Sequence, residues 1–318
     1  MTPALAAANN GNWRTARRWA RLLGQAYRVR LTDAWDAGDE AAMIALHARR
    51  SAASIAAWRA AHPGRPLVVA LTGTDLYRDI DSDSSARRSL LLADALVVLN
   101  ELGARRLPEA LRGKTQVVLQ SSPARAALPR CTRHLRALMV GHLREEKDPR
   151  TYWRAAERLA TRRDIRLDHI GAALDAALGA EASALAARLP QLRWLGGLPH
   201  GEVRRRIQAA HVLVHASRME GGAQVVIEAI RSGTPVLASR IDGNLGLLGE
   251  DYEGLFEPGD DAALAALLAR ARDDRAMLPR LAAALGTRSP LFAPEAERGA
   301  LLALVDRLLA RRPAAPSP

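Results

Sequence analysis

The sequence has very little cysteine, few aromatic residues and no long hydrophobic run. Cys131 is the single cysteine among 318 residues, which excludes an internal disulfide and is typical of a reducing compartment. No apolar stretch approaches the roughly 20 residues that cross a bilayer. The first residues carry neither the basic nor the apolar region of a secretory signal. We therefore expect a cytoplasmic protein without stable membrane insertion.

Lysine is also scarce, although the formal net charge is +12. Lys114 and Lys147 are the only lysines, and the arginines are spread along the chain, for example over residues 150–163. A diffuse surface charge is the simpler interpretation, so we expect no nucleic-acid partner. A basic nucleic-acid-binding protein is the alternative of another class, and a steep salt dependence of duplex binding would support it. Because the chain uses arginine almost everywhere, Lys147 is a candidate for a required point charge.

Short apolar runs alternate with longer amphipathic stretches. The runs predict strands at Tyr27–Leu31, Met43–Leu46, Leu67–Leu71, Ala95–Leu99, Gln116–Leu119, Leu135–Val140, Ile165–Ile170, Val212–Val214, Pro235–Ala238 and Gly254–Phe256. The amphipathic stretches predict helices, for example at Trp13–Leu23, Ser51–Ala61, Arg150–Ala160, Glu202–Ala210 and Glu295–Ala310. This alternation predicts an α/β fold of two doubly wound, Rossmann-like domains with parallel sheets, facing each other across a cleft.

The domain boundary is predicted within Ser121–Arg133, which contains two prolines and no periodicity. We assign residues 1–130 to the first domain and residues 131–292 to the second. Residues 293–318 form a further helix and a frayed tail. Ligands of open α/β sheets bind outside the carboxyl ends of the strands, so the loops that follow the strands are the candidate site.

The loop after the predicted strand Val212–Val214 carries two glutamates in the stretch SRMEGGAQVVIEA. Glu220 precedes Gly221 and Gly222, and Glu228 follows within the next helix. Glycines at a helix start allow a ligand to approach the backbone closely. A carboxylate among apolar residues needs partners, and sugar hydroxyls would serve Glu228. The simpler interpretation is that Glu220 supports the helix start and Glu228 pairs with an arginine.

Four more loops are predicted at the same edge of the second sheet. Gly141, His142, Arg144 and Lys147 follow one strand, and a lysine near a helix start suits a phosphate. The other three loops contain Gly171, the stretch Trp194–His200 with Leu198, and Ser239–Gly246. Taken alone, the loop of Lys147 would more commonly be a solvated charged loop.

In combination and order, these motifs resemble the nucleotide-sugar-binding half of retaining GT-B glycosyltransferases, with Glu220 and Glu228 as the Glu-x7-Glu pair. The resemblance implies that Glu228 holds the ribose of a UDP-sugar and that Lys147 stabilises the leaving diphosphate. It implies that Glu220 acts in catalysis and, with the backbone of Gly221–Ala223, contacts the donor sugar. Leu198 would meet the uracil, while Gly141 and Gly171 complete the donor site. His142 stands where the family usually has arginine, and Arg144 is its expected substitute.

Segments of both halves also resemble the selenosugar synthases of selenoneine biosynthesis, which join a UDP-sugar to selenophosphate. These segments are Asn9–Asn12, Ala45–Ala52, Ala70–Ile80, Met219–Gly222 and Ser239–Asn244. The resemblance implies UDP-N-acetylglucosamine or UDP-glucose as donor, selenophosphate as acceptor and no cofactor. It leaves the choice of sugar, the anomeric outcome and the oligomeric state open.

Several residues of the first domain fit an anionic acceptor. Arg49 and Arg50 follow a strand and open a helix, with His47 beside them, and cations at a helix start are mildly unfavourable unless an anion binds there. The other acceptor candidates are Thr72, Gly73, Asp75, Arg78 and the loop residues Asn10, Gly11 and Asn12. The simpler role of Asp75 is to cap the next helix. Because little sequence precedes Asn10, we expect the natural start of this domain to lie upstream.

The stretch Asp79-Ile-Asp-Ser-Asp83 contains an Asp-x-Asp pattern that binds divalent metals in another glycosyltransferase fold. It does not close an apolar strand, so we interpret it as an acidic loop and predict no metal.

The main alternative function is a conventional GT-B glycosyltransferase that acts on a hydroxyl of a small molecule, lipid or glycan. With six Trp, four Tyr and two Phe, the chain offers little aromatic surface for stacking on a glycan. A GT-B epimerase is a weaker possibility.

Overall fold

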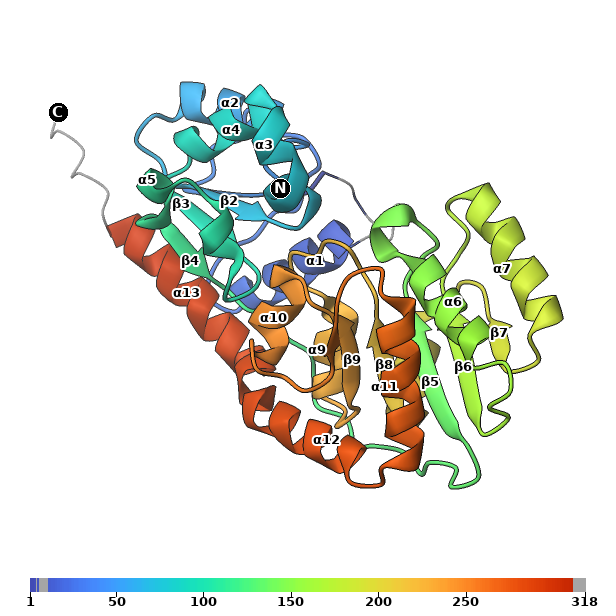
Figure 1. Cartoon of the computed structure of the whole chain (residues 1–318). Coiled ribbons are helices and arrows are strands. Elements are labelled where there is room, and N and C mark those ends of the chain that lie inside the picture. Colours follow the sequence, from blue (N-terminus) through green and yellow to red (C-terminus); the bar gives the residue numbers. More distant parts are fainter. Residues whose placement is uncertain (4, 6–10, 311–318) are drawn as a thin grey trace, which may run out of the picture. The chain divides into compact units, whose positions relative to one another are not determined.

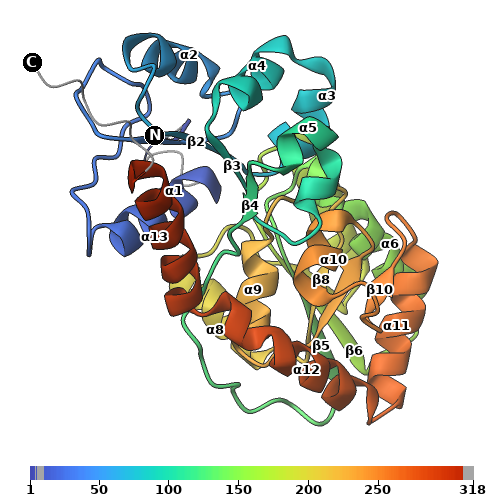
Figure 2. The same ribbon diagram turned by 90° about the vertical axis from the view of Figure 1, so that its left-hand side faces the viewer.

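The computed structural model describes residues 1–3, 5 and 11–310, and the chain divides into two compact units (Figures 1 and 2). The first unit comprises Met1–Ser121, Glu220–Gly222 and Pro294–Pro318, and the second comprises Ser122–Met219 and Ala223–Ala293. The division falls at Ser121, ahead of the predicted boundary at residue 130, and the last helix belongs to the first unit. The predicted frayed tail lies outside the described residues.

The first unit is built on a four-stranded parallel sheet in the order β1-β2-β3-β4. Its strands are β1 (Met43–Leu46), β2 (Leu67–Leu71), β3 (Ala95–Val98) and β4 (Thr115–Val117). Its helices are α1 (Gly11–Leu23), α2 (Ala52–Ala61), α3 (Ile80–Ser82), α4 (Ser84–Leu92), α5 (Glu109–Arg112) and α13 (Pro294–Ala310). Short turns of other helix types cover Asp75–Asp79 and Gly103–Arg106.

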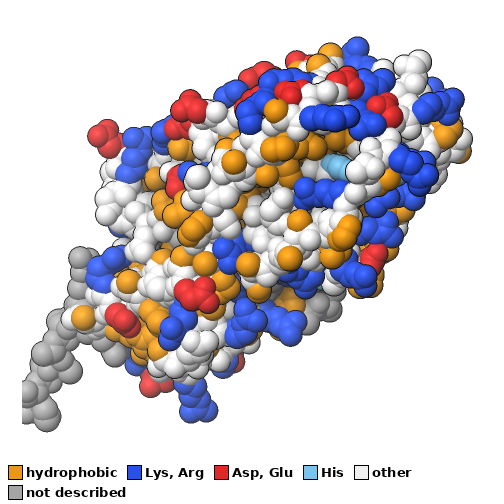
Figure 3. Space-filling view, turned by 90° about the horizontal axis from the view of Figure 1, so that it is seen from below, with side chains coloured by type: hydrophobic (Ala, Val, Ile, Leu, Met, Phe, Trp, Pro, Cys, Tyr) orange, Lys and Arg blue, Asp and Glu red, His pale blue; other side chains and the backbone are white. Residues whose placement is uncertain are grey.

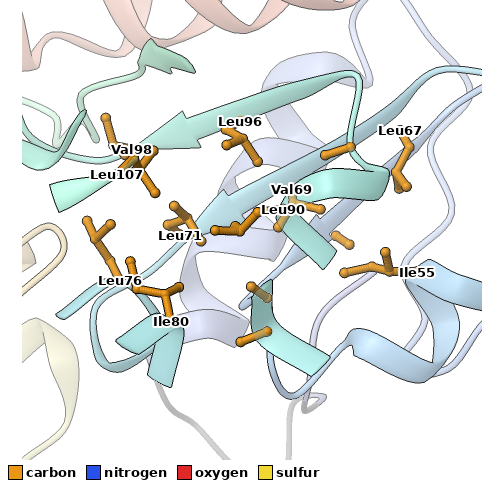
Figure 4. Close-up of a cluster of buried hydrophobic side chains, with 14 of the residues drawn as sticks. Ile55, Leu67, Val69, Leu71, Leu76, Ile80, Leu90, Leu96, Val98 and Leu107 are labelled. Carbon is orange, nitrogen blue, oxygen red and sulfur yellow. The ribbon is translucent and has the colours of Figure 1, made fainter. Parts of the chain in front are cut away.

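Strand β2 shows why this sheet is covered on both faces. All five of its residues are buried, and successive side chains of a strand point to opposite faces. Leu67, Val69 and Leu71 pack with α2 and α4, as Figure 4 shows. Val68 and Ala70 pack on the other face with α1 and α13. A continuous run of Val and Leu is therefore what a central parallel strand requires.

Helix α13 is fastened to the first unit by one buried carboxylate. Glu297 accepts hydrogen bonds from Trp19 Nε1 at 2.7 Å, from Arg18 Nε at 2.8 Å and from the backbone N–H of Ser121 at 2.9 Å. These donors come from α1 and from the segment that follows β4. The buried charge of Glu297 is thus balanced by Arg18, and the carboxylate also accepts hydrogen bonds from Trp19 and Ser121.

The second unit contains a six-stranded parallel sheet in the order β10-β9-β8-β5-β6-β7. Its strands are β5 (Leu135–Val140), β6 (Ile165–Ile170), β7 (Leu192–Trp194), β8 (Val212–His215), β9 (Val236–Ser239) and β10 (Leu255–Phe256). Its helices are α6 (Pro149–Arg158), α7 (Ala176–Arg188), α8 (His200–Ala209), α9 (Gln224–Ile230), α10 (Asp242–Leu248), α11 (Asp261–Asp273) and α12 (Met277–Arg288). Single 3-10 turns span Glu145–Lys147 and Ser289–Phe292. Helices α6 and α11 pack together, as do α8 and α9. None of the helices within residues 11–310 is long and apolar enough to cross a membrane.

The structure corrects two predictions and adds one strand. Tyr27–Leu31 alternates like a strand but is not one, because Met1 occupies the edge of β1, where its nitrogen donates to the Ile44 carbonyl oxygen and its carbonyl oxygen accepts the Leu46 N–H. Strand β7 was not predicted, since three residues are too few to show a period. Asp79–Asp83 is not a loop, because Asp79 ends a π-helical turn and Ile80–Ser82 form α3. The predicted fold class, two doubly wound parallel α/β domains, is confirmed.

Candidate functional site

The carboxyl edge of the second sheet brings four of the predicted loops together. Gly171, after β6, lies so close to the turn after β5 that a Cβ there would stand 1.8 Å from the Gly141 carbonyl oxygen. His169 donates from Nε2 to the same oxygen at 3.1 Å, while its Nδ1 accepts from Trp153 Nε1 at 3.1 Å. Burial lowers the pKa of His169 to about 4, so this support stays neutral at physiological pH.

Lys147 lies at the end of the turn that follows Gly141. A Cβ on Gly141 would be 3.5 Å from Lys147 Cγ, so the lysine stem packs directly against that turn. The next residue, Asp148, has φ 45° and begins α6 at Pro149. The exposed side chain of Arg144 lies on the same loop. His142 is held by the neighbouring loop, because its Nδ1 accepts the backbone N–H of Ala172 at 3.1 Å.

The stretch Trp194–His200 is attached to the loop after β6. Trp194 donates from Nε1 to the carbonyl oxygen of Gly171 at 2.8 Å, and the Gly171 N–H donates to Gly196 at 2.8 Å. Leu198 is half-buried in this segment, just ahead of α8. The loop of Lys147 and the loop of Leu198 therefore both contact the loop of Gly171, which lies between them.

Glu228 lies inside α9 and its side chain is buried. His200, the first residue of α8, places Nε2 at 2.8 Å from Glu228 Oε1. Arg204 Nη1 lies 4.0 Å from the same oxygen. Burial lowers the pKa of Arg204, and its guanidinium donates to Ser122 Oγ and to the carbonyl oxygen of Pro123. The simpler interpretation, in which Glu228 pairs with an arginine, holds in part, because Arg204 lies near Oε1 while His200 makes the hydrogen bond.

A buried polar network that the sequence reading missed lies beneath Ser217. His215 Nδ1 is 2.9 Å from Asn244 Oδ1, and Asn244 Nδ2 donates to the carbonyl oxygen of Ser239 at 2.9 Å. Ser239 Oγ in turn donates to the carbonyl oxygen of Ser217 at 2.5 Å. The ends of β8 and β9 and the start of α10 are thereby joined. The signal for this network was the histidine in the otherwise apolar strand Val212–His215.

The segment Glu220–Gly222 belongs by its contacts to the first unit. The Gly221 carbonyl oxygen accepts from Asn100 Nδ2 at 2.7 Å. A Cβ on Gly221 would lie 2.4 Å from the Thr72 carbonyl carbon, and one on Gly222 would lie 2.9 Å from Leu99 Cβ. Protein atoms therefore fill the space that these glycines leave. This close packing explains why both positions are glycine.

In the first unit, Asp75 clamps two strand-end turns. One carboxylate oxygen accepts the N–H groups of Thr72 and Gly73, each at 2.9 Å, and the other accepts that of Ala48 at 3.0 Å. The side chain is fully buried, so the structure favours this role over contact with a sugar. Gly73 has φ 145° in the turn that Asp75 closes.

His47 and three arginines lie around this clamp. His47 is buried with φ 72°, its Nε2 is 3.1 Å from Thr74 Oγ1, and burial is the main cause that lowers its pKa. A positive φ at a buried histidine is a costly conformation that often marks a functional turn. Arg49 and Arg78 both donate to Asp79, at 2.8 and 3.2 Å. Arg50 is exposed.

The remaining acceptor candidates are Asn10, Gly11 and Asn12. Asn10 lies outside the described residues, and Gly11 and Asn12 begin α1, so they are helical where we expected a loop.

Among the described residues, no group of three or more His, Cys, Asp or Glu side chains is placed to hold a metal ion. Lys and Arg side chains are spread over the face in Figure 3 among acidic and apolar ones.

The sequence profile of the family described as "Glycosyl transferases group 1" matches residues 123–288, more than half of the chain. The chain belongs to this family. No curated protein sequence matches the chain. The matched residues include the loops of Gly141, Lys147 and Leu198, and the helix of Glu228.

Solved structures agree in fold. Anabaena Alr3699/HepE in complex with UDP-glucose is 17% identical, with a TM-score of 0.69 over 84% of this chain and 79% of that one. Sucrose-phosphate synthase from Thermosynechococcus elongatus is 20% identical, with a TM-score of 0.70 over 85% and 74%. The lipopolysaccharide outer core galactosyltransferase WaaB is 16% identical, with a TM-score of 0.62 over 83% and 75%. At these identities the likeness shows the fold, which is GT-B.

Proposed function

We propose that this group 1 glycosyltransferase uses a UDP-sugar as donor. The observation that carries the proposal is the joined edge of the second sheet, where the Lys147 turn, the Leu198 loop and Glu228 all fall within the family match. HepE, a structural neighbour, is solved with UDP-glucose and with UDP. Residues 131–292 are the proposed donor domain.

In this proposal each donor residue has one task. Lys147, assisted by Arg144, stabilises the charge that develops on the leaving diphosphate. Glu228 accepts hydrogen bonds from the ribose hydroxyls, and Leu198 lies against the uracil. Glu220 contacts the donor sugar together with the backbone of Gly221–Ala223. No metal ion is required, because the cationic side chains neutralise the diphosphate.

We further propose that the acceptor is selenophosphate and that residues 1–130 form its domain. The selenium attacks the anomeric carbon with its own electron pair, and the bond from that carbon to the UDP oxygen breaks, so no side-chain base is needed. Water then attacks phosphorus, and the phosphorus–selenium bond breaks to give phosphate and a 1-seleno-sugar. Arg49 and Arg50 at the turn of His47 support this assignment, because arginines bind phosphate-like oxyanions well.

A conventional transferase is the second candidate, and one contact favours it. His47 Nε2 lies 3.9 Å from Asp79 Oδ2, and a histidine beside a carboxylate is a common general base for a hydroxyl acceptor. Asp79 also offsets the charges of Arg49 and Arg78, which weakens their hold on an anion.

The deciding experiment measures UDP release from UDP-N-acetylglucosamine and from UDP-glucose under reducing conditions, with and without selenophosphate. Release that requires selenophosphate, with a selenium-bearing sugar in the product mass, supports the proposal. Release that occurs only with a hydroxyl compound supports the second candidate. UDP affinity that K147A and E228Q leave unchanged would overturn the donor site itself.

A further inference from the structure

Glu228 has a single hydrogen-bond partner for its side chain among the described residues. That partner is His200, whose Nε2 lies 2.8 Å from Oε1, whereas no described residue bonds to Oε2. The carboxylate is 3% exposed, so the oxygen that remains is held in a low-dielectric surrounding where a second hydrogen bond is strong. Because Oε1 is already bonded to His200, the buried carboxylate can use Oε2 to accept a hydrogen bond from a hydroxyl group.

His200 reaches Glu228 from the helix that follows the Leu198 loop. It is the first residue of α8, directly after Pro199, and its side chain is half-exposed. Helices α8 and α9 pack against each other, so the histidine and the carboxylate face each other across this contact. The imidazole ring of His200 thus connects the end of the Leu198 loop to the Glu228 carboxylate.

Arg204 does not form the same contact with Glu228 as His200. Its Nη1 is 4.0 Å from Glu228, beyond hydrogen-bond distance, and its terminal nitrogens donate to Ser122 and Pro123. It contributes charge at a distance, while the direction of the Glu228 carboxylate is set by His200.

We propose that His200 is a positioning residue for ribose recognition. It donates Nε2–H to Oε1 of Glu228, fixes the carboxylate plane and leaves Oε2 for a ribose hydroxyl. This inference rests on the proposed function, in which Glu228 binds the ribose of UDP.

The test compares the affinity for UDP with that for 2′,3′-dideoxy-UDP, because the ratio isolates the contact to the ribose hydroxyls. Titration calorimetry would be applied to the wild type, E228Q, H200A, H200F and H200Q. R205A is the matched control, since Arg205 is an exposed residue of the same helix. The wild type should prefer UDP by at least about tenfold, as expected for hydrogen bonds to a charged group.

H200A and H200F should reduce that preference to about threefold or less, whereas H200Q, which retains a donor at the Nε2 position, should preserve most of it. R205A should match the wild type. A preference that persists in H200F, or is lost equally in H200F and H200Q, would overturn the role of His200. If the wild type shows no preference and E228Q changes nothing, the ribose role of Glu228 fails instead. The pair H200F and H200Q decides the matter even if H200A does not fold.

Discussion

Arg218 Nε lies 3.1 Å from Asp148 Oδ2, and the backbone N–H of Arg218 donates to the Glu146 carbonyl oxygen at 2.9 Å. These two contacts join the loop after β8, which leads to Glu220, to the turn that carries Lys147. Asp148 also accepts from Thr151 Oγ1 at 2.8 Å, so its buried carboxylate holds the start of α6 as well. These contacts hold the start of the loop after β8 against the turn that carries Lys147.

Loss of the Arg218 side chain should weaken nucleotide binding without unfolding the protein. R218M leaves Asp148 without its cation and loosens the Lys147 turn, so the Kd for UDP should rise about 3- to 10-fold, the size of one ordinary net hydrogen bond, because the effect reaches the nucleotide only indirectly. Calorimetry measures the effect, and R166A, at an exposed position of β6, is the control. If R218M binds UDP like the wild type, the Lys147 turn keeps its position without the Arg218 side chain.

Alanine at Gly221 should destabilise the protein. The added Cβ would meet backbone atoms of Thr72 and Gly73 at 2.4 to 2.7 Å, which no side-chain rotation relieves. We expect a cost of about 1–3 kcal/mol, measured as a lower midpoint of thermal unfolding. G299A, in the exposed middle of α13 with nothing within 4 Å, should instead stabilise by about 0.5–1 kcal/mol. Equal midpoints for G221A and the wild type would contradict the close packing of this loop.

His169 should make stability depend on pH. Its pKa is about 4 in the folded protein and about 6.5 when unfolded, so between these values only the unfolded chain binds the proton. The free energy of unfolding should therefore fall as the pH decreases, by about 2 kcal/mol from this residue between pH 7.5 and pH 5. Urea denaturation of the wild type and H169Q at both pH values isolates the contribution of His169 to this change. An identical pH dependence in H169Q would assign the effect to other groups.

Asp75 should prove structural. In D75N an amide NH2 replaces one oxygen, so at least one of the N–H groups of Ala48, Thr72 and Gly73 loses its acceptor, at a cost of about 1–3 kcal/mol. D81N should change the midpoint of thermal unfolding little, because Asp81 is exposed and its ion pair with Arg106 lies at the surface. UDP affinity should be unchanged in D75N. A stable D75N with altered acceptor kinetics would restore the predicted contact with substrate.

The sequence predicted the elements whose signal is local. Leu67–Leu71 and Ile165–Ile170 form the strands that their apolar runs indicated. Tyr27–Leu31 has an equally good alternation, but alternation cannot tell whether an unpaired strand edge is within reach. The interpretation of Asp79–Asp83 failed for a similar reason, because Asp79 is buried and pairs with Arg49, which is 30 residues away in the sequence, as well as with its neighbour Arg78.

For the candidate site, residue types and spacing placed Lys147 and Glu228 on a strand-end turn and on a helix. They did not predict the partners. The pairing of Glu228 with His200 joins positions 28 residues apart, and the reason for Gly221 lies in Thr72, far back in the sequence. Such contacts follow from the packing of helices and loops, which a local pattern does not contain.

The attachment of α13 through Glu297 has a consequence for synthesis of the chain. Trp19 and Ser121 are translated early, but their shared carboxylate partner comes only after the whole second unit. The apolar face that α13 covers, with Val68 and Val97, stays open until then. The nascent first unit must therefore expose this face while the second unit folds, which makes it a site for chaperone binding and for aggregation during expression. Truncations that remove α13 should accumulate as insoluble protein.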